Sequence, residues 1–85
     1  MFRWIKRWFQ KPMQRQAILY TRQGCHLCEV ASQTLEQAGY GVKQVDIDED
    51  PELRQKFDHE VPVVEIDGRI RFRGRVDPLL LKRLS

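Results

Sequence analysis

The feature that most constrains this chain is a pair of cysteines, Cys25 and Cys28, placed directly after the short apolar run 17–21. They are the only two cysteines among the 85 residues, and two positions separate them. If the apolar run is a strand and Cys25 opens a helix, both sulfurs lie on the first helical turn, where they can close a disulfide. A helix N-terminus supplies unpaired N–H groups and about half a positive charge, which favours a thiolate at Cys25. A strand followed by C-x-x-C at a helix start is typical of a redox-active dithiol.

Length and composition limit the chain to one domain of ordinary globular type. Of its residues 41% are hydrophobic and 32% are charged, and 85 residues leave room for a single modest core. Two cysteines cannot build the framework of a small secreted scaffold, no apolar run approaches the ~20 residues of a membrane span, and the N-terminus lacks the uncharged stretch of a secretory signal. We therefore expect a reducing cytoplasm, where an adjacent C-x-x-C is more often catalytic or metal-binding than structural. The net charge of +3 is too small to indicate a nucleic-acid partner.

Residues 1–16 follow a different pattern from the rest and are predicted to be an extension of a domain that covers 17–85. On a helical projection the apolar side chains of 2–11 gather on one side and the basic ones on the other, and Pro12 ends the pattern. The apolar ones are Phe2, Trp4, Ile5, Trp8 and Phe9, and the basic ones are Arg3, Lys6, Arg7 and Lys11. Two interpretations remain open: a basic amphipathic helix on an anionic membrane surface or a partner, or a segment packed on its own domain or poorly ordered.

From Ala17 onward the capping and turn residues of the sequence predict alternating strands and helices. A strand over Ala17–Thr21 leads to a helix over 25–38, which Gly39 ends as a left-handed cap. A second strand, Val42–Ile47, should pair parallel to the first through a right-handed crossover. The positions expected on the buried face of the helix are Cys28, Ala31, Leu35 and Ala38.

The middle of the chain predicts a short helix and then a third strand. Asp50 and Pro51 have the form of an N-cap and a proline at the first helical position, and Leu53 and Phe57 follow at buried-face spacing. The other acidic residues just before this helix are expected to form a solvated loop; they are Asp46, Asp48 and Glu49. The third strand is 63–66.

The last part of the chain predicts a hairpin and a final helix. Asp67–Gly68 is a strong hairpin signal, and Ile70 and Phe72 alternate with arginines on the strand beyond it. The arginines at 69, 71, 73 and 75 either keep an edge strand from aggregating or, for Arg73 and Arg75, recognise an acidic partner or glutathione. Asp77 and Pro78 again have the form of an N-cap and a proline at the first position of a helix. Its inward positions are expected to be Leu80, Leu81 and Leu84.

This order of elements, with C-x-x-C at the first helix and Val61–Pro62 before the hairpin, resembles the thioredoxin fold in its minimal, glutaredoxin-like form. The likeness covers about residues 17–84 and is similar to small bacterial glutaredoxin-like proteins. It implies an α/β fold with a four-stranded mixed sheet in the order 2-1-3-4 and flanking helices. It also implies that Cys25 is the nucleophile, Cys28 the resolving cysteine, and Pro62 a cis-proline facing them, with the Val61 backbone binding a thiol substrate.

The resemblance extends to a glutathione site, with departures. Gly74 and Asp77 match the end of the glutaredoxin Gly-Gly-x-Asp stretch that holds the glutamyl end of glutathione, while Arg75 replaces its second glycine. Arg22 stands near the place of a basic residue that binds the glycyl carboxylate, and His26 stands where the family usually has proline. The substrate-binding residues that the resemblance implies are Arg22, His26, Val61, Pro62, Gly74, Arg75 and Asp77.

The function predicted from these residues is thiol–disulfide exchange that reduces protein or glutathione mixed disulfides. It needs no bound cofactor or metal, only glutathione or a reductase partner as the electron source. The pKa of Cys25 should lie below that of a free thiol, and the pKa of Cys28 should not. A zinc site would use both cysteines with His26 and His59, but the sequence has no second paired ligand set. The remaining alternative is a thioredoxin-fold binding or scaffold module that cycles little and is tethered through its N-terminal helix.

Overall fold

A computed structural model of the chain describes residues 15–84, so the helix predicted for 2–11 lies outside the described residues. The order of the elements is the predicted one, with one added turn of 3₁₀ helix (η2). The elements are β1 (Gln16–Thr21), α1 (His26–Gln37), β2 (Gly41–Asp46), η2 (Ile47–Glu49), α2 (Pro51–Phe57), β3 (Val63–Ile66), β4 (Arg69–Arg73) and α3 (Pro78–Leu84). None of the helices within 15–84 has the length and apolar character needed to cross a membrane.

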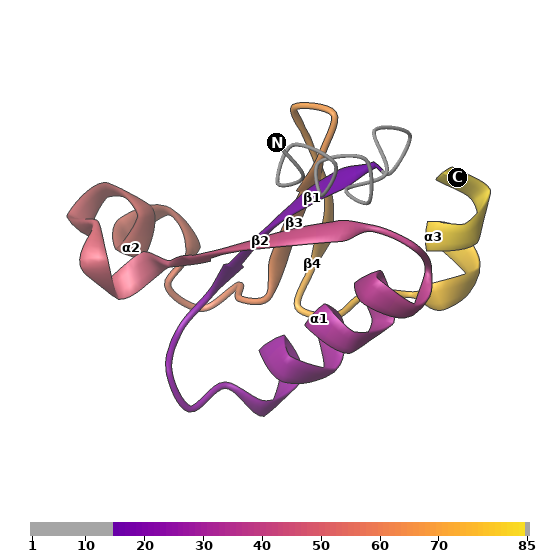
Figure 1. Ribbon diagram of the computed structural model, residues 1–85. Helices are drawn as coiled ribbons and strands as arrows, with labels where there is room; N and C mark the ends of the chain where they lie inside the picture. The colour runs from indigo at the N-terminus through magenta and orange to yellow at the C-terminus, as the bar shows by residue number, and fades with distance from the viewer. Residues whose placement is uncertain (1–14, 85) are drawn as a thin grey trace, which may run out of the picture.

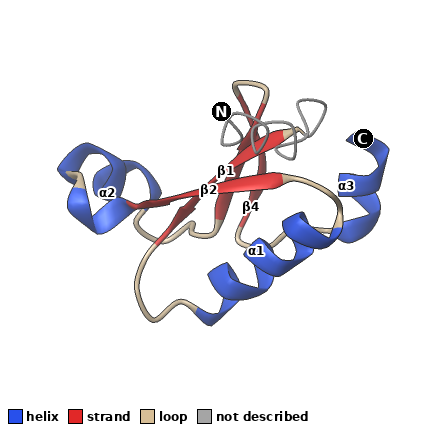
Figure 2. Cartoon of the chain, in the orientation of Figure 1, coloured by secondary structure: helices blue, strands red, loops and turns tan. Residues whose placement is uncertain are grey.

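The four strands form one mixed sheet in the order β2-β1-β3-β4, which confirms the predicted order (Figures 1 and 2). β1 pairs parallel with β2 from Gln16↔Gly41 to Thr21↔Asp46, and antiparallel with β3, where Tyr20 lies opposite Val63. The last residues of β1 and β2 and the first residue of β3 therefore lie at the same end of the sheet. The segments attached to them are 22–25, η2 and 58–62, and these must come together at that end.

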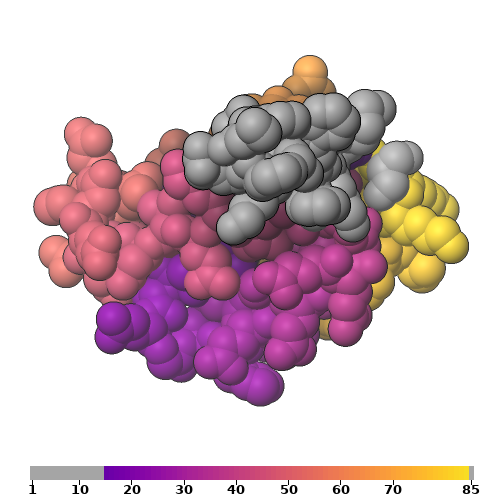
Figure 3. Space-filling view, in the orientation of Figure 1, coloured from indigo at the N-terminus to yellow at the C-terminus, as the bar shows by residue number. Residues whose placement is uncertain are grey.

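Helices cover both faces of the sheet (Figure 1), and each face has its own core. Leu19 and Val64 pack with Leu35 of α1 and Leu81 of α3 on one face. Ile47, Phe57 and Val63 form the second core, with Tyr20 and Leu53 against them. Because successive side chains of a strand point to opposite faces, neighbours such as Leu19 and Tyr20 belong to different cores. Figure 3 shows α1 along the lower front of the molecule, with α3 at one end and α2 at the other.

The capping signals are confirmed. Asp50 accepts hydrogen bonds from the N–H groups of Glu52 (2.9 Å) and Leu53 (3.5 Å) at the start of α2. Asp77 accepts from the N–H of Leu79 (2.9 Å) at the start of α3. Gly39 has the predicted positive φ, at 92°.

Two predictions about side chains and one about the end of a strand are wrong. Leu80 is 48% exposed, because the seven-residue α3 directs Leu81 into the core and turns Leu80 toward solvent. Ala38 is exposed, because α1 ends at Gln37 and Ala38 is its C-cap. Ile47 is buried but lies outside β2, since the Asp46 carboxylate accepts the N–H of Asp48 (2.9 Å) and starts η2 instead.

The hairpin forms as predicted, but with an irregularity in its second strand. Asp67 and Gly68 both have positive φ, as a tight two-residue hairpin requires. The pairing of β3 with β4 shifts between Val64↔Phe72 and Glu65↔Ile70, so the strand bulges by one residue. Phe72 therefore joins the core under α1 and Ile70 packs against the other, although the sequence pattern places both on one face.

Candidate functional site

Cys25 and Cys28 stand at the start of α1 and are joined by a disulfide, with Cα atoms 5.2 Å apart. Cys25 is the N-cap residue, and its Sγ accepts the N–H of Cys28 at 3.1 Å. Its carbonyl oxygen accepts the N–H groups of Cys28 (3.2 Å) and Glu29 (3.3 Å). Cys28 is only 3% exposed, whereas Cys25 is half-buried. The two cysteines are therefore unequal: Cys25 is within reach of solvent, and Cys28 is shielded behind it.

The segment that enters the site from β4 is tied to the proline segment. The Val61–Pro62 peptide bond is cis, as the resemblance implies, and Pro62 is buried. The N–H of Gly74 donates to the carbonyl oxygens of both Pro62 (2.8 Å) and Glu60 (3.0 Å). Gly74 has a φ of 84°, a conformation that residues with a Cβ seldom adopt. The glycine at 74 thus fixes the chain beside Pro62, at the end of the sheet where β1 leads to Cys25.

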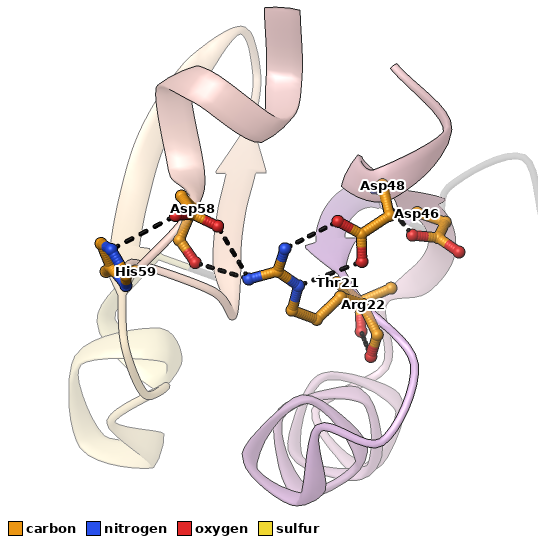
Figure 4. Close-up of polar contacts among 6 residues, drawn as sticks. All are labelled: Thr21, Arg22, Asp46, Asp48, Asp58 and His59. Atoms are coloured by element: carbon orange, nitrogen blue, oxygen red, sulfur yellow. Dashed lines mark hydrogen bonds and ion pairs between the residues drawn. The ribbon is translucent and has the colours of Figure 1, made fainter. Parts of the chain in front are cut away.

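Arg22 follows β1 and joins three segments that are far apart in the sequence (Figure 4). Its Nε and Nη2 donate to the two carboxylate oxygens of Asp48, at 3.1 and 2.6 Å. Its Nη1 donates to the carboxylate (3.0 Å) and the carbonyl oxygen (2.8 Å) of Asp58, whose other carboxylate oxygen lies 3.2 Å from Nε2 of His59. Arg22 therefore clamps the loop before Cys25 to η2 and to the end of α2.

This clamp has electrostatic consequences for the site. The hydrogen bonds that Arg22 donates to Asp48 and Asp58 raise the pKa of Arg22 above its already high value, and the same bond to Asp48 holds the pKa of that carboxyl below its usual value. Two carboxylates thus offset the single charge of Arg22, and with the Asp58 carbonyl oxygen they engage all three of its side-chain nitrogens. Asp48 is exposed to solvent as predicted, but it lies in η2 rather than in a loop and its carboxylate is paired with Arg22.

Two hollows flank the first turns of α1. The polar hollow, of about 280 Å³, is lined by residues 21–25 and by Cys28, Glu29, Gln44 and Asp46. The apolar hollow, of about 390 Å³, is lined by Leu27, Val30, Ala31 and Thr34 of α1 and by residues 74–76. Both cysteines line the polar hollow, whereas the apolar hollow reaches the first turn of α1 through Leu27.

The remaining predicted site residues are dispersed. Arg75 is exposed and lines the apolar hollow together with Gly74. The His26 side chain is 84% exposed, with Nδ1 at 3.9 Å from the Glu29 carboxylate. Asp77 lies outside both hollows and caps α3. Between residues 15 and 84, no three His, Cys, Asp or Glu side chains are grouped so that they could hold a metal ion.

Sequence reasoning missed two contributors to the site. Asp58 was not singled out, although it holds Arg22, because 36 positions separate the two and no local pattern relates them. Val30 was also missed; the sequence signal that could have identified it is an apolar residue outside the buried face of an amphipathic helix, and in the structure it is 42% exposed.

Comparison with known proteins gives consistent likenesses. The family model described as "Glutaredoxin-like domain (DUF836)" matches residues 16–84. A Dictyostelium discoideum protein named "Glutaredoxin-like protein YDR286C homolog" is 32% identical over 68 residues, and the match spans 68% of this chain and 63% of that relative's length.

Solved structures agree with the fold. The X. campestris protein XcR50 superposes with a TM-score of 0.69 at 33% identity, over 80% of this chain and 92% of that one. The glutaredoxin-like protein NrdH-redoxin of Escherichia coli, described as having a thioredoxin-like activity profile, gives a TM-score of 0.63 at 26% identity, over 82% and 95% of the two chains. These likenesses confirm the predicted thioredoxin-like fold in its glutaredoxin form.

Proposed function

The chain belongs to the glutaredoxin-like domain family, and from that membership we propose that it is a thiol–disulfide oxidoreductase acting through Cys25 and Cys28. The observation that carries the proposal is the asymmetric cysteine pair at the N-terminus of α1. Cys25 caps the helix within reach of solvent, and Cys28 is shielded within disulfide distance of it. An attacking thiolate must be accessible, and a resolving thiol must be close to it but protected from outside disulfides.

The proposed reaction moves two electrons and two protons to a client disulfide. The Cys25 thiolate attacks one client sulfur, forms a mixed disulfide and releases the other client sulfur as a thiolate, which takes up a proton. Cys28 then loses its proton and attacks the Cys25 sulfur, so the second client thiolate leaves and is protonated. The products are the Cys25–Cys28 disulfide and a client dithiol.

The arrangement around Cys25 supports its role as the nucleophile. The N–H of Cys28 points at its sulfur, and the unpaired N–H groups of the first helical turn carry partial positive charge, so negative charge on Cys25 is stabilised. The Arg22 clamp adds little to that effect, because Asp48 and Asp58 already offset its charge. We assign Arg22 to holding the loop before Cys25, and the contact with substrate to the Val61–Pro62 and Gly74–Arg75 segments.

The oxidised pair must be returned to the dithiol by an external thiol. Two glutathione molecules, or the dithiol of a reductase partner, supply the two electrons in this proposal, and no resident metal or cofactor takes part. The thioredoxin-like activity profile described for NrdH-redoxin supports including a reductase partner among the electron sources to be assayed.

The test combines a trapping variant with a reduction-potential titration. In Cys28→Ser the mixed disulfide cannot be resolved, so the full chain should retain a disulfide client through Cys25, whereas Cys25→Ser should retain none. The wild-type pair should equilibrate in thiol redox buffers at about −270 to −200 mV, the range spanned by thioredoxin and glutaredoxins. A pair that does not cycle, together with full biological effect in Cys25→Ser, would support the scaffold alternative instead.

A further inference from the structure

All four of the large apolar side chains that are well exposed within residues 15–84 belong to α1 and α3. Leu27 (55%) and Val30 (42%) are on α1, and Leu79 (73%) and Leu80 (48%) are on α3. These two helices lie on the same face of the sheet (Figures 1 and 3). Leu27 and Val30 lie on the first turns of α1, which also hold both cysteines, whereas Leu79 and Leu80 lie on the helix that packs at the other end of α1.

Two neighbouring hollows follow α1 on the side that faces α3. The apolar hollow beside Leu27 adjoins a second hollow of about 490 Å³, and Thr34 lines both. The second hollow is bounded by Gln37 and Ala38 of α1 and by Pro78, Leu81 and Lys82 of α3. We call the two together the α1–α3 groove. It begins at the residue between the two cysteines and ends at the far end of α1.

The length of the groove favours a polypeptide over a small thiol. From Leu27 to Ala38 a helix rises about 16 Å at ~1.5 Å per residue. An extended chain of about five residues spans that distance, whereas a tripeptide such as glutathione reaches about 10 Å at most. Glutathione also has no apolar side chain to place against Val30 and Leu27.

The charges that border the groove determine which polypeptide it fits. The only charged residues that line it are Arg75 and Lys82, and both are basic. On the other side of the dithiol the polar hollow is lined by Glu29 and Asp46, and its one cation, Arg22, is paired with two carboxylates. A chain segment with carboxylates is attracted to one side of α1 and repelled from the other.

From these observations we infer that the α1–α3 groove docks an extended client segment of about five residues that carries apolar side chains and at least one carboxylate. Its apolar side chains lie against Leu27 and Val30, and its carboxylates meet Arg75 and Lys82. This inference rests on the proposed function, because docking there delivers the client's disulfide to Cys25.

Peptide disulfides test the inference through charge reversal. Two peptides of equal length are compared, one with leucine and two aspartates beside its cysteine and one with leucine and two lysines. Since one exposed ion pair is worth less than tenfold, two pairs should give the acidic peptide about a tenfold higher kcat/KM, and Arg75→Glu with Lys82→Glu should reverse the preference. Because each preference is the ratio of kcat/KM for the two peptides in one protein, any general change in reactivity toward disulfides cancels.

A matched control separates docking from net charge. Arg69→Glu with Arg71→Glu makes the same change of charge on exposed β4 positions that do not line the groove. It should leave the preference for the acidic peptide within about twofold of the wild type. Two results would overturn the inference. One is an equal change of peptide preference in the two double variants, and the other is glutathione disulfide that is reduced as fast as the acidic peptide and responds equally to Arg75→Glu.

Binding without chemistry separates this inference from the proposed function. In the full chain with Cys25→Ser and Cys28→Ser, the reduced acidic peptide should shift amide resonances of 27–38 and 74–82 and leave those of α2 unchanged. If these shifts occur but the wild type reduces no disulfide, the redox proposal is rejected and the docking surface is supported. Reduction of hydroxyethyl disulfide without any such shifts would support the redox proposal and reject the docking surface.

Discussion

Leu81 and Leu79 are two positions apart on α3, yet Leu81 is fully buried and Leu79 is 73% exposed. Truncation of each to alanine removes the same atoms from very different surroundings. Leu→Ala substitutions in a core cost about 2–5 kcal/mol, the value rising with the cavity left behind. Because Leu81 also borders the open α1–α3 groove, the space it leaves is not sealed, so we expect the lower part of that range, about 2–3 kcal/mol.

Leu79→Ala is the matched control on the same helix. Its side chain has little contact to lose, alanine is a slightly better helix former, and the N–H that donates to Asp77 is a backbone group that remains. We expect its effect on the free energy of unfolding to stay within about 0.5 kcal/mol. Leu80→Ala, at 48% exposure, should fall between the two.

Urea unfolding followed by circular dichroism, with the cysteine pair held oxidised in every variant, measures these differences. A domain of 85 residues has about 4–13 kcal/mol of stability, so Leu81→Ala should remain folded but lose a large share of it. Each kcal/mol should lower the Tm by about 4–8 °C. A cost below about 1 kcal/mol for Leu81→Ala, or equal costs at 79 and 81, would show that α3 is not anchored through Leu81.

Three further predictions concern the site. The Asp48 carboxyl should titrate by NMR below its usual pKa and return toward it in Arg22→Gln, and since a lowered folded pKa stabilises only the ionised form, that contribution is complete above about pH 4 and is lost as the pH falls through the folded value; an unchanged titration in Arg22→Gln would contradict the ion pair. Gly74→Ala should cost about 1–2 kcal/mol of unfolding free energy from its positive φ alone, because an added Cβ meets no atom within 4 Å, whereas Gly74→Asn should cost less; a larger loss for asparagine than for alanine would reject this reasoning. Iodoacetamide should alkylate Cys25 of the reduced protein with an inflection below pH ~8.5, and an inflection at or above that pH would show that the helix N-terminus does not activate the thiol.

The parts of the fold that could be predicted from the sequence are those whose signals are local. Asp50 caps α2 and Asp77 caps α3 because a carboxylate one position before a helix reaches N–H groups only two or three residues ahead. Asp67–Gly68 forms the hairpin because that pair adopts positive φ at low cost. Strand order followed from the succession of these local elements, together with the resemblance.

Features that depend on distant segments could not be read in the same way. The partners of Arg22 lie 26 and 36 positions away, and only the meeting of β1, β2 and β3 at one edge of the sheet brings them together. The shift in pairing between β3 and β4 moved Ile70 to the other face of the sheet, which an alternating pattern cannot signal. The prediction for Leu80 was wrong because 79–81 are consecutive leucines on a short helix, so the sequence does not show which of them faces inward. Packing against the sheet buries Leu81.

Arg75 stands where the glutaredoxin motif has its second glycine. The two neighbouring positions therefore differ here: residue 74 is constrained by its backbone conformation, and residue 75 contributes a side chain. Gly74 carries the duty of backbone geometry, since its positive φ and its N–H bind the segment to the carbonyl oxygen of Pro62. Arg75 has no such requirement: Asp67 is the only non-glycine residue within 15–84 with positive φ, so residue 75 adopts an ordinary conformation in which any side chain fits. The glycine that the backbone needs is present, and the position that it does not need holds a cation at the border of the apolar hollow. In the proposed function, reactivity at Cys25 and selection of the client can therefore vary independently, because the first would depend on the helix N-terminus and the second on side chains such as Arg75 that play no part in holding the dithiol.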